Sequence, residues 1–119
     1  RDYKLTGVQT CALPIWVRFP QRYIRSRMRA RLREADDLLR RGRLREAAIK
    51  YNELADELEQ NGFAVKALAI SRQVVEIAHD VPALRSAALH RLVRLYTLLD
   101  RRTDAEEARK LIEGDRRKL

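Results

Sequence analysis

The chain has 119 residues, enough for one small domain with a modest hydrophobic core. It is basic, with a formal net charge of +9, and 36% of its residues are charged. No stretch approaches the ~20 consecutive apolar residues of a membrane-spanning helix, so we expect a cytoplasmic protein with no membrane partner. Cys11 is the single cysteine, which excludes a disulfide framework and a thiolate metal site.

Residues 1–15 fit no structural pattern. The ten residues from Thr6 to Ile15 correspond, codon by codon, to one reading frame of a short-read sequencing adapter, and the adapter's last base begins a codon that fits Trp16. We therefore interpret residues 1–15 as a sequencing artefact, disordered or irregular, and leave them out of the fold prediction. The alternative is a natural, irregular tail. On the first interpretation residues 16–119 are a metagenomic fragment of a longer bacterial protein.

Residues 16–119 have the hydrophobic periodicity of an all-α domain. Apolar side chains recur every three or four residues, as in Ile24, Met28 and Leu32, and do not alternate as in a strand. Gly42, Gly62 and Pro82 interrupt this pattern at intervals of 20 residues. Short loops at these breaks make neighbouring helices antiparallel. We expect helices near residues 22–41, 44–60, 63–79, 83–100 and 104–113.

Several expected helix ends have recognisable signals. Asn61 and Gly62 supply the left-handed residue with which helices commonly end. Pro82 suits the first turn of the helix that follows it. Thr103 and Glu106 have the spacing of a capping box, which predicts that the last helix begins directly after Thr103.

The residues at these breaks resemble the tetratricopeptide repeat (TPR) family, in which alanine follows the hairpin glycine by five residues and an aromatic residue comes four later. Gly42, Ala47 and Tyr51 match this pattern, and Gly62 and Ala67 match its first part. The resemblance is degenerate and covers about residues 27–113. It implies a short TPR-like α-solenoid of stacked helical hairpins. Further positions that fit it are Pro82 between repeats, Ala87, Tyr96 and Ala108, whereas Ser71 stands where the pattern has an aromatic residue.

The resemblance leaves the pairing of the helices open. Gly42 and Gly62 are 20 residues apart, whereas a regular array would place consecutive hairpin turns about 34 residues apart. Either one repeat is atypical or the helices pair in a shifted register.

The positive charge is concentrated on the first expected helix and the turn after it. Between Arg18 and Arg45 eleven arginines face three carboxylates, a net of +8, whereas residues 46–119 are neutral. The guanidinium group of arginine binds oxyanions through two hydrogen bonds. These arginines therefore form a basic ridge that is a candidate contact for a polyanion or an acidic partner, and a solvated helix face is the alternative. Projected onto a helix, five arginines fall on one side: Arg22, Arg25, Arg29, Arg33 and Arg40.

The second expected helix carries an opposite, acidic face formed by Glu53, Asp56, Glu57 and Glu59. We expect this face either to be solvated or to match the basic first helix of a neighbouring repeat or of a second chain.

Catalytic and metal-binding motifs are absent from the sequence. His79 and His90 are the only histidines and have no partner at metal-ligand spacing, so we expect both on the surface or at helix ends. The sequence has no nucleophile elbow, phosphate-binding loop or calcium loop. We therefore predict no enzyme activity, no catalytic or metal-binding residue and no cofactor.

The function that we expect is a protein–protein interaction scaffold, whose partner is an unidentified protein or peptide. Stacked helical hairpins expose a surface that accepts extended or helical segments. Nucleic-acid or other polyanion binding through the arginine ridge is the less favoured alternative, since base-stacking aromatics are absent beyond Tyr23. A structural spacer in a signalling protein is a third possibility. Neither the binding face nor the oligomeric state follows from the sequence.

Overall fold

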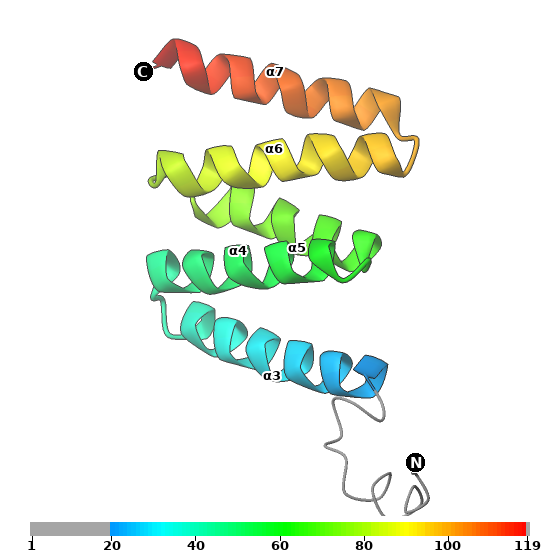
Figure 1. Cartoon of the computed structure of the whole chain (residues 1–119). Coiled ribbons are helices and arrows are strands. Elements are labelled where there is room, and N and C mark those ends of the chain that lie inside the picture. Colours follow the sequence, from blue (N-terminus) through cyan, green and yellow to red (C-terminus); the bar gives the residue numbers. More distant parts are fainter. Residues whose placement is uncertain (1–19, 119) are drawn as a thin grey trace, which may run out of the picture. The chain divides into compact units, whose positions relative to one another are not determined.

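The structure, a computed structural model, describes residues 20–118, so the adapter-like residues 1–15 lie outside the described residues. Within residues 20–118 the chain forms five α-helices and no strand, which confirms the all-α prediction (Figure 1). The helices are α3 (Pro20–Arg40), α4 (Leu44–Gln60), α5 (Ala64–Ile77), α6 (Pro82–Leu98) and α7 (Arg102–Lys118).

The predicted boundaries hold within two residues for α3 to α6 and for the start of α7, whereas the predicted end of α7 was wrong. That helix begins at Arg102 and continues through Gly114 to Lys118, instead of covering residues 104–113. Gly114 does not end the helix because its backbone lacks the positive φ of a left-handed cap. Three basic residues in the last turn favour the longer helix, since cations stabilise the negative end of the helix dipole: Arg116, Arg117 and Lys118.

Three of the four turns end a helix in the same way. Gly42 and Gly62 have φ values of 77° and 82°, and Asp100 takes the equivalent place before α7 with φ 58°. After Gly62 the amide of Phe63 donates to the carbonyl of Leu58 at 2.9 Å, which satisfies one of the last carbonyls of α4. The left-handed residue before α7 is therefore Asp100.

An arginine–carboxylate pair marks the start of α4 and of α7. The Arg43 guanidinium binds Glu46 with two hydrogen bonds of 2.6 Å. Arg101 Nε donates in the same way to Asp104, at 2.8 Å. The predicted capping box of Thr103 and Glu106 was wrong, because Thr103 lies inside the first turn of α7.

The described part of the chain belongs to two units, residues 20–30 and residues 31–118. In the second unit each helix from α4 onward packs against the next one in sequence. In addition α4 contacts α6, so α5 bridges two helices that also touch each other. In Figure 1 α5 lies behind α4 and α6.

One buried cluster within residues 31–118 is built mainly of alanine around the ring of Tyr51. Tyr51 is fully buried, and its hydroxyl donates a hydrogen bond to Asp36. The helices can approach closely because most residues around this ring have the smallest apolar side chain. The buried cluster contains Ala35, Ala47, Ala48, Tyr51, Val74, Ala78 and Ala88.

The small residues of the repeat pattern are buried in three helices and misplaced in one. Ala47, Ala67 and Ala108 are buried, whereas Ala87 is exposed and its neighbour Ala88 lies in the core. The five-residue spacing fails there because α6 starts directly at Pro82, without the glycine turn that precedes α4 and α5. A shift of one residue turns a side chain by about 100° on a helix. Tyr96, the other predicted aromatic, is buried as expected.

Among the described helices, none combines the length and apolar character needed to cross a bilayer.

The two kinds of glycine in the structure should respond oppositely to alanine. A Cβ added at Gly62 or at Gly114 would contact no other atom, so backbone conformation alone decides the effect. Gly62→Ala should lower the free energy of unfolding by about 1 kcal/mol, because it forces an L-residue into the left-handed region. Gly114→Ala should raise it by about 0.5–1 kcal/mol, because alanine is the better residue inside a helix.

Urea unfolding followed by far-UV circular dichroism measures both values. A loss of stability in Gly114→Ala would contradict the helix assigned through that position.

Candidate functional site

An arginine inside the apolar stripe of α6 forms the most unusual feature of the described residues. Arg91 follows Ala88 by three residues, and both lie on the side of α6 that is buried. The opposite position on α5 is Ser71, which is fully buried and much smaller than the aromatic residue of the repeat pattern. The space beside Ser71 is filled by the Arg91 side chain, which is 4% exposed.

Polar groups from two other helices hold the Arg91 guanidinium. Its Nη1 donates to Asn52 Oδ1 of α4 at 3.0 Å and lies 3.4 Å from Ser71 Oγ of α5. Its Nε is buried without a hydrogen bond, 3.7 Å from Glu59 Oε1. A buried charge is costly unless it is paired, so Arg91 fixes the position of α6 against α4 and α5.

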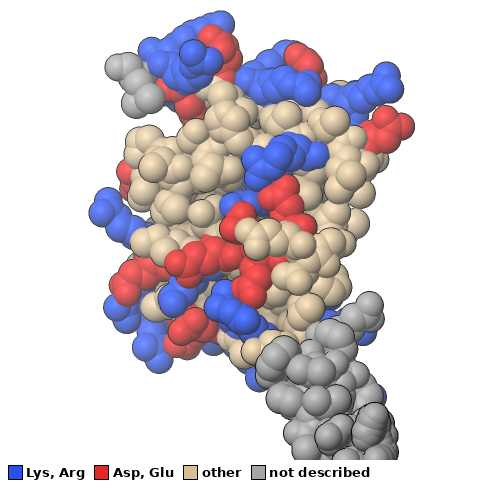
Figure 2. All heavy atoms as spheres, in the orientation of Figure 1, with Lys and Arg blue, Asp and Glu red and all other residues tan. Residues whose placement is uncertain are grey.

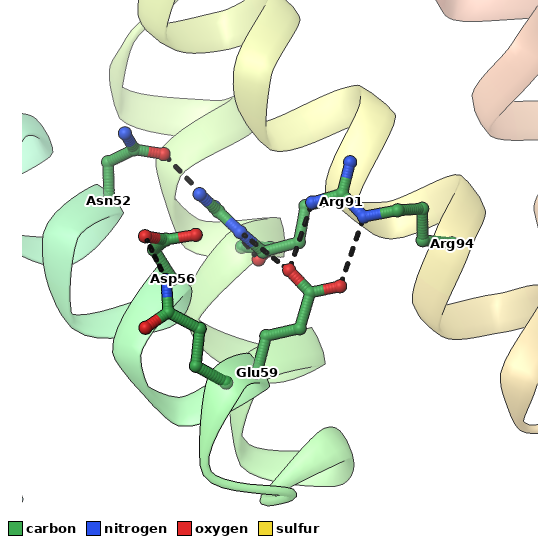
Figure 3. Close-up of polar contacts among 7 residues, drawn as sticks. Asn52, Asp56, Glu59, Arg91 and Arg94 are labelled. Atoms are coloured by element: carbon green, nitrogen blue, oxygen red, sulfur yellow. Dashed lines mark hydrogen bonds and ion pairs between the residues drawn. The ribbon is translucent and has the colours of Figure 1, made fainter.

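Glu59 connects this buried arginine to the surface. Arg94, one turn after Arg91 on α6, donates two hydrogen bonds of 3.0 and 2.9 Å to the Glu59 carboxylate. Glu59 and Asn52 both come from α4, and Figure 3 shows them turned toward the two arginines. On the same helix Asp56 accepts a hydrogen bond from Gln60 at 3.0 Å. We call the surface formed by Asn52, Asp56, Glu59, Arg91 and Arg94 the α4–α6 face.

The electrostatics of the α4–α6 face follow from this geometry. The hydrogen bonds from Arg94 lower the pKa of Glu59, and the same bonds raise the pKa of Arg94. Burial lowers the pKa of Arg91, and the nearby carboxylates of Asp56 and Glu59 oppose this effect. All three groups keep their charges at neutral pH, because the carboxylate is stabilised as an anion and guanidinium groups are always protonated.

The acidic face predicted for α4 is divided between two neighbouring helices. Glu57 forms an ion pair with Arg31 of α3, and Glu59 pairs with Arg94 of α6. Glu53 is exposed and forms no ion pair or hydrogen bond with another side chain among residues 20–118. In Figure 2 acidic atoms form a band over α4, while uncharged atoms cover much of the neighbouring α6. The first of these pairs joins α4 to the basic helix α3 of the same chain.

The arginines predicted as a basic ridge all lie on α3 and are exposed. Arg40 is partly neutralised by Asp37, at 3.4 Å. Arg25, Arg29 and Arg33 form no ion pair with the described residues, which leaves their guanidinium groups available to a partner.

His79 and His90 are exposed, at the end of α5 and on α6, as expected from the sequence. Across residues 20–118 no group of three or more histidine, cysteine or acidic side chains is placed to hold a metal ion.

Sequence reasoning missed the central residue of the α4–α6 face. A signal was present, since Arg91 interrupts an apolar stripe at helical spacing, with Ala88 and Leu95 on either side. Its partners Asn52 and Glu59 have no such signal, because their roles depend on the contact between two helices that are not consecutive.

The chain was compared with protein-family models, curated proteins and solved structures, and none of them matches it.

Replacing Glu59 should destabilise the protein in a pH-dependent way. The pKa of Glu59 is lowered in the folded state, so near this pKa the unfolded chain binds more protons. The stabilisation is therefore present above the ordinary glutamate pKa of 4.5 and is lost as the pH falls through the folded-state value. Glu59→Gln should lower the free energy of unfolding by about 2 kcal/mol at neutral pH and by much less in acid.

Glu53→Gln is the matched control, because Glu53 is an exposed glutamate of the same helix that pairs with no side chain in the described part of the protein. Urea unfolding of both variants at neutral and acidic pH makes the comparison. An equal loss in Glu59→Gln at both pH values would contradict the pairing of Glu59 with the two arginines.

Proposed function

We propose that residues 16–119 are a non-catalytic scaffold of TPR-like helical hairpins that binds a protein or peptide partner. The contact between α4 and α6 is the observation that supports it most, because it joins two helices that are not consecutive. Stacking of this kind makes a surface that runs across hairpins, on which repeat proteins bind extended or helical segments.

The same contact favours one pairing of the helices. With α4 and α5 as one hairpin and α6 and α7 as the next, the first helices of both hairpins are the ones that touch. The hairpin turns then contain Gly62 and Asp100, which share the left-handed conformation. Their separation of 38 residues is close to the ~34 of a regular array, unlike the interval between Gly42 and Gly62.

The α4–α6 face has properties of a binding surface. Its central charges are held by hydrogen bonds from fixed helices, so little conformational freedom is lost when a partner binds. Beside it α4 exposes Ile49 and Glu53, one turn apart, which offer an apolar and an anionic contact. Such a surface suits a peptide that combines apolar and basic side chains.

Selection from a random peptide display library on the whole chain tests this function. We expect enriched peptides whose affinity falls at least about tenfold in the double variant Ile49→Arg, Glu53→Arg, because a new positive charge replaces both contacts.

The matched control is Val65→Arg, Glu76→Arg, which makes the same change of charge at two exposed positions on α5. It should bind the selected peptides as the unchanged chain does. Enrichment of no peptide would contradict the scaffold and favour a structural spacer. Equal losses in the two variants would contradict binding at the α4–α6 face.

Polyanion binding through α3 is the second candidate, because Arg25, Arg29 and Arg33 are exposed and form no ion pair with the described residues. Measuring the affinity of the chain for a generic single-stranded oligonucleotide, beside its affinity for the selected peptides, separates the two functions. Affinity that falls steeply with added salt, and falls again when these three arginines are changed to alanine, would favour the second candidate. The scaffold predicts no oligonucleotide binding even at low salt.

A further inference from the structure

A cleft of about 590 Å³ opens between the first half of α6 and the second half of α7. Its apolar lining consists of Pro82 and Leu89 of α6 and Ile112 of α7. Leu89 is fully buried beneath the surface, and Ile112 is half-buried. The cleft is therefore a hollow with an apolar floor, of a size that holds a few side chains of a partner.

One side of the cleft is held by a hydrogen-bonded ion pair. Arg85 Nε of α6 donates to Asp115 Oδ2 of α7 at 2.6 Å, and Arg85 Nη1 donates to the carbonyl of Val75 at 3.0 Å. Both side chains are largely shielded from solvent, so the pair fixes α7 against α6 and the end of α5. The cleft is formed before any partner binds.

The charges around the cleft are predominantly positive. Among the described residues that line it, Asp115 is the only carboxylate, and Arg85 already neutralises that carboxylate. Lys118 has no ion pair with the described residues. Arg116 lies 3.9 Å from Glu113, an exposed pair that contributes little. α6 itself contains no acidic residue, and Asp80, which precedes it, lies 3.3 Å from the His79 ring and not beside these two cations.

Both histidines of the chain also line this cleft, although the sequence places them 11 residues apart without a shared motif. The His90 ring nitrogen Nδ1 lies 2.8 Å from the carbonyl of Ser86, so Nδ1 donates and the ring is held in place. His79 Nδ1 lies 3.2 Å from the carbonyl of Glu76, in a similar arrangement at the end of α5. Two positioned imidazoles add polar contacts beside the apolar floor.

From this combination we infer that the cleft between α6 and α7 binds an acidic peptide segment that also carries an apolar side chain. The apolar side chain contacts Pro82 and Ile112, which line the cleft and are accessible, and the carboxylates of the peptide pair with Arg116 and Lys118. The inference rests on the proposed scaffold function and adds a second site, distinct in place and in charge preference from the α4–α6 face.

Fluorescence anisotropy with short labelled peptides tests the inference on the whole chain. The probe is a peptide of glutamate and leucine, and it is compared with a glutamate–serine peptide and a lysine–leucine peptide. We expect the glutamate–leucine peptide to bind at least about tenfold more tightly than either of the others. Only this peptide has both an apolar side chain for the floor of the cleft and carboxylates for its cations. Equal binding of the two acidic peptides would overturn the role of the apolar floor.

Two double variants locate the site. Arg116→Glu with Lys118→Glu reverses the two cations of the cleft and should weaken binding of the glutamate–leucine peptide at least about tenfold. Lys110→Glu with Arg117→Glu makes the same change of charge at exposed positions of α7 that do not line the cleft. The control should lose less than about threefold, and equal losses in the two double variants would overturn the inference. Circular dichroism establishes that both variants keep their helices.

The remaining outcomes separate this inference from the proposed function. If library-selected peptides bind the chain but the glutamate–leucine peptide does not, the cleft is not an acidic-peptide site and the scaffold function stands. If no peptide of either kind binds, both proposals fail.

Equal binding of the glutamate–leucine peptide and of an oligonucleotide would overturn the inference in favour of non-specific attraction to anions. Sedimentation gives one further outcome. If the unchanged chain forms a dimer and Ile112→Ser does not, the cleft binds a second copy of the chain, and the inference is overturned.

Discussion

The helices of this chain lie close together because alanine fills the positions at which neighbouring helices meet. Ala47 and Ala48 of α4, Ala67 of α5 and Ala88 of α6 are all completely buried. Small side chains allow two helix backbones to approach, and the remaining volume is then filled by a few large residues such as Tyr51. The contact between α4 and α6 lies beside α5, whose buried positions include the small residues Ala67 and Ser71. The candidate binding surface therefore depends on packing.

Close packing also explains how a charged residue can lie inside the unit formed by residues 31–118. Arg91 occupies space that Ser71 leaves open, and the neighbouring helices provide Asn52 and Glu59 as partners. Pairs of this kind add little net stability, because desolvation of the charges offsets most of their attraction. They do define a single arrangement, because sliding α6 along α4 would separate the guanidinium from its partners. The two proposed binding sites then differ in charge: α4 presents carboxylates, and the cleft between α6 and α7 presents cations.

The sequence predicts the helices of this protein better than their contacts. Hydrophobic periodicity and left-handed turn residues are local signals, so α3 to α6 and the turn at Gly62 could be predicted. The end of α7 could not, because Gly114 is compatible with either a helix interior or a cap. Ala87 was assigned a packing role that Ala88 has, since counting from a turn fails where a helix starts with proline. The α4–α6 face and the cleft could not be predicted, because each depends on contacts between separate helices.

The pair Ala87 and Ala88 allows the most direct test of the packing on which this account depends. The two residues are adjacent on α6, but Ala88 is buried in the core and Ala87 is exposed. Ala88→Leu should overpack the helix contacts and lower the free energy of unfolding by about 1–3 kcal/mol. Ala87→Leu should change it by no more than about 0.5 kcal/mol, as for most surface substitutions. Urea unfolding of the two variants decides the matter: a large loss in Ala87→Leu with an unchanged Ala88→Leu would contradict the orientation of α6 and the contacts built on it.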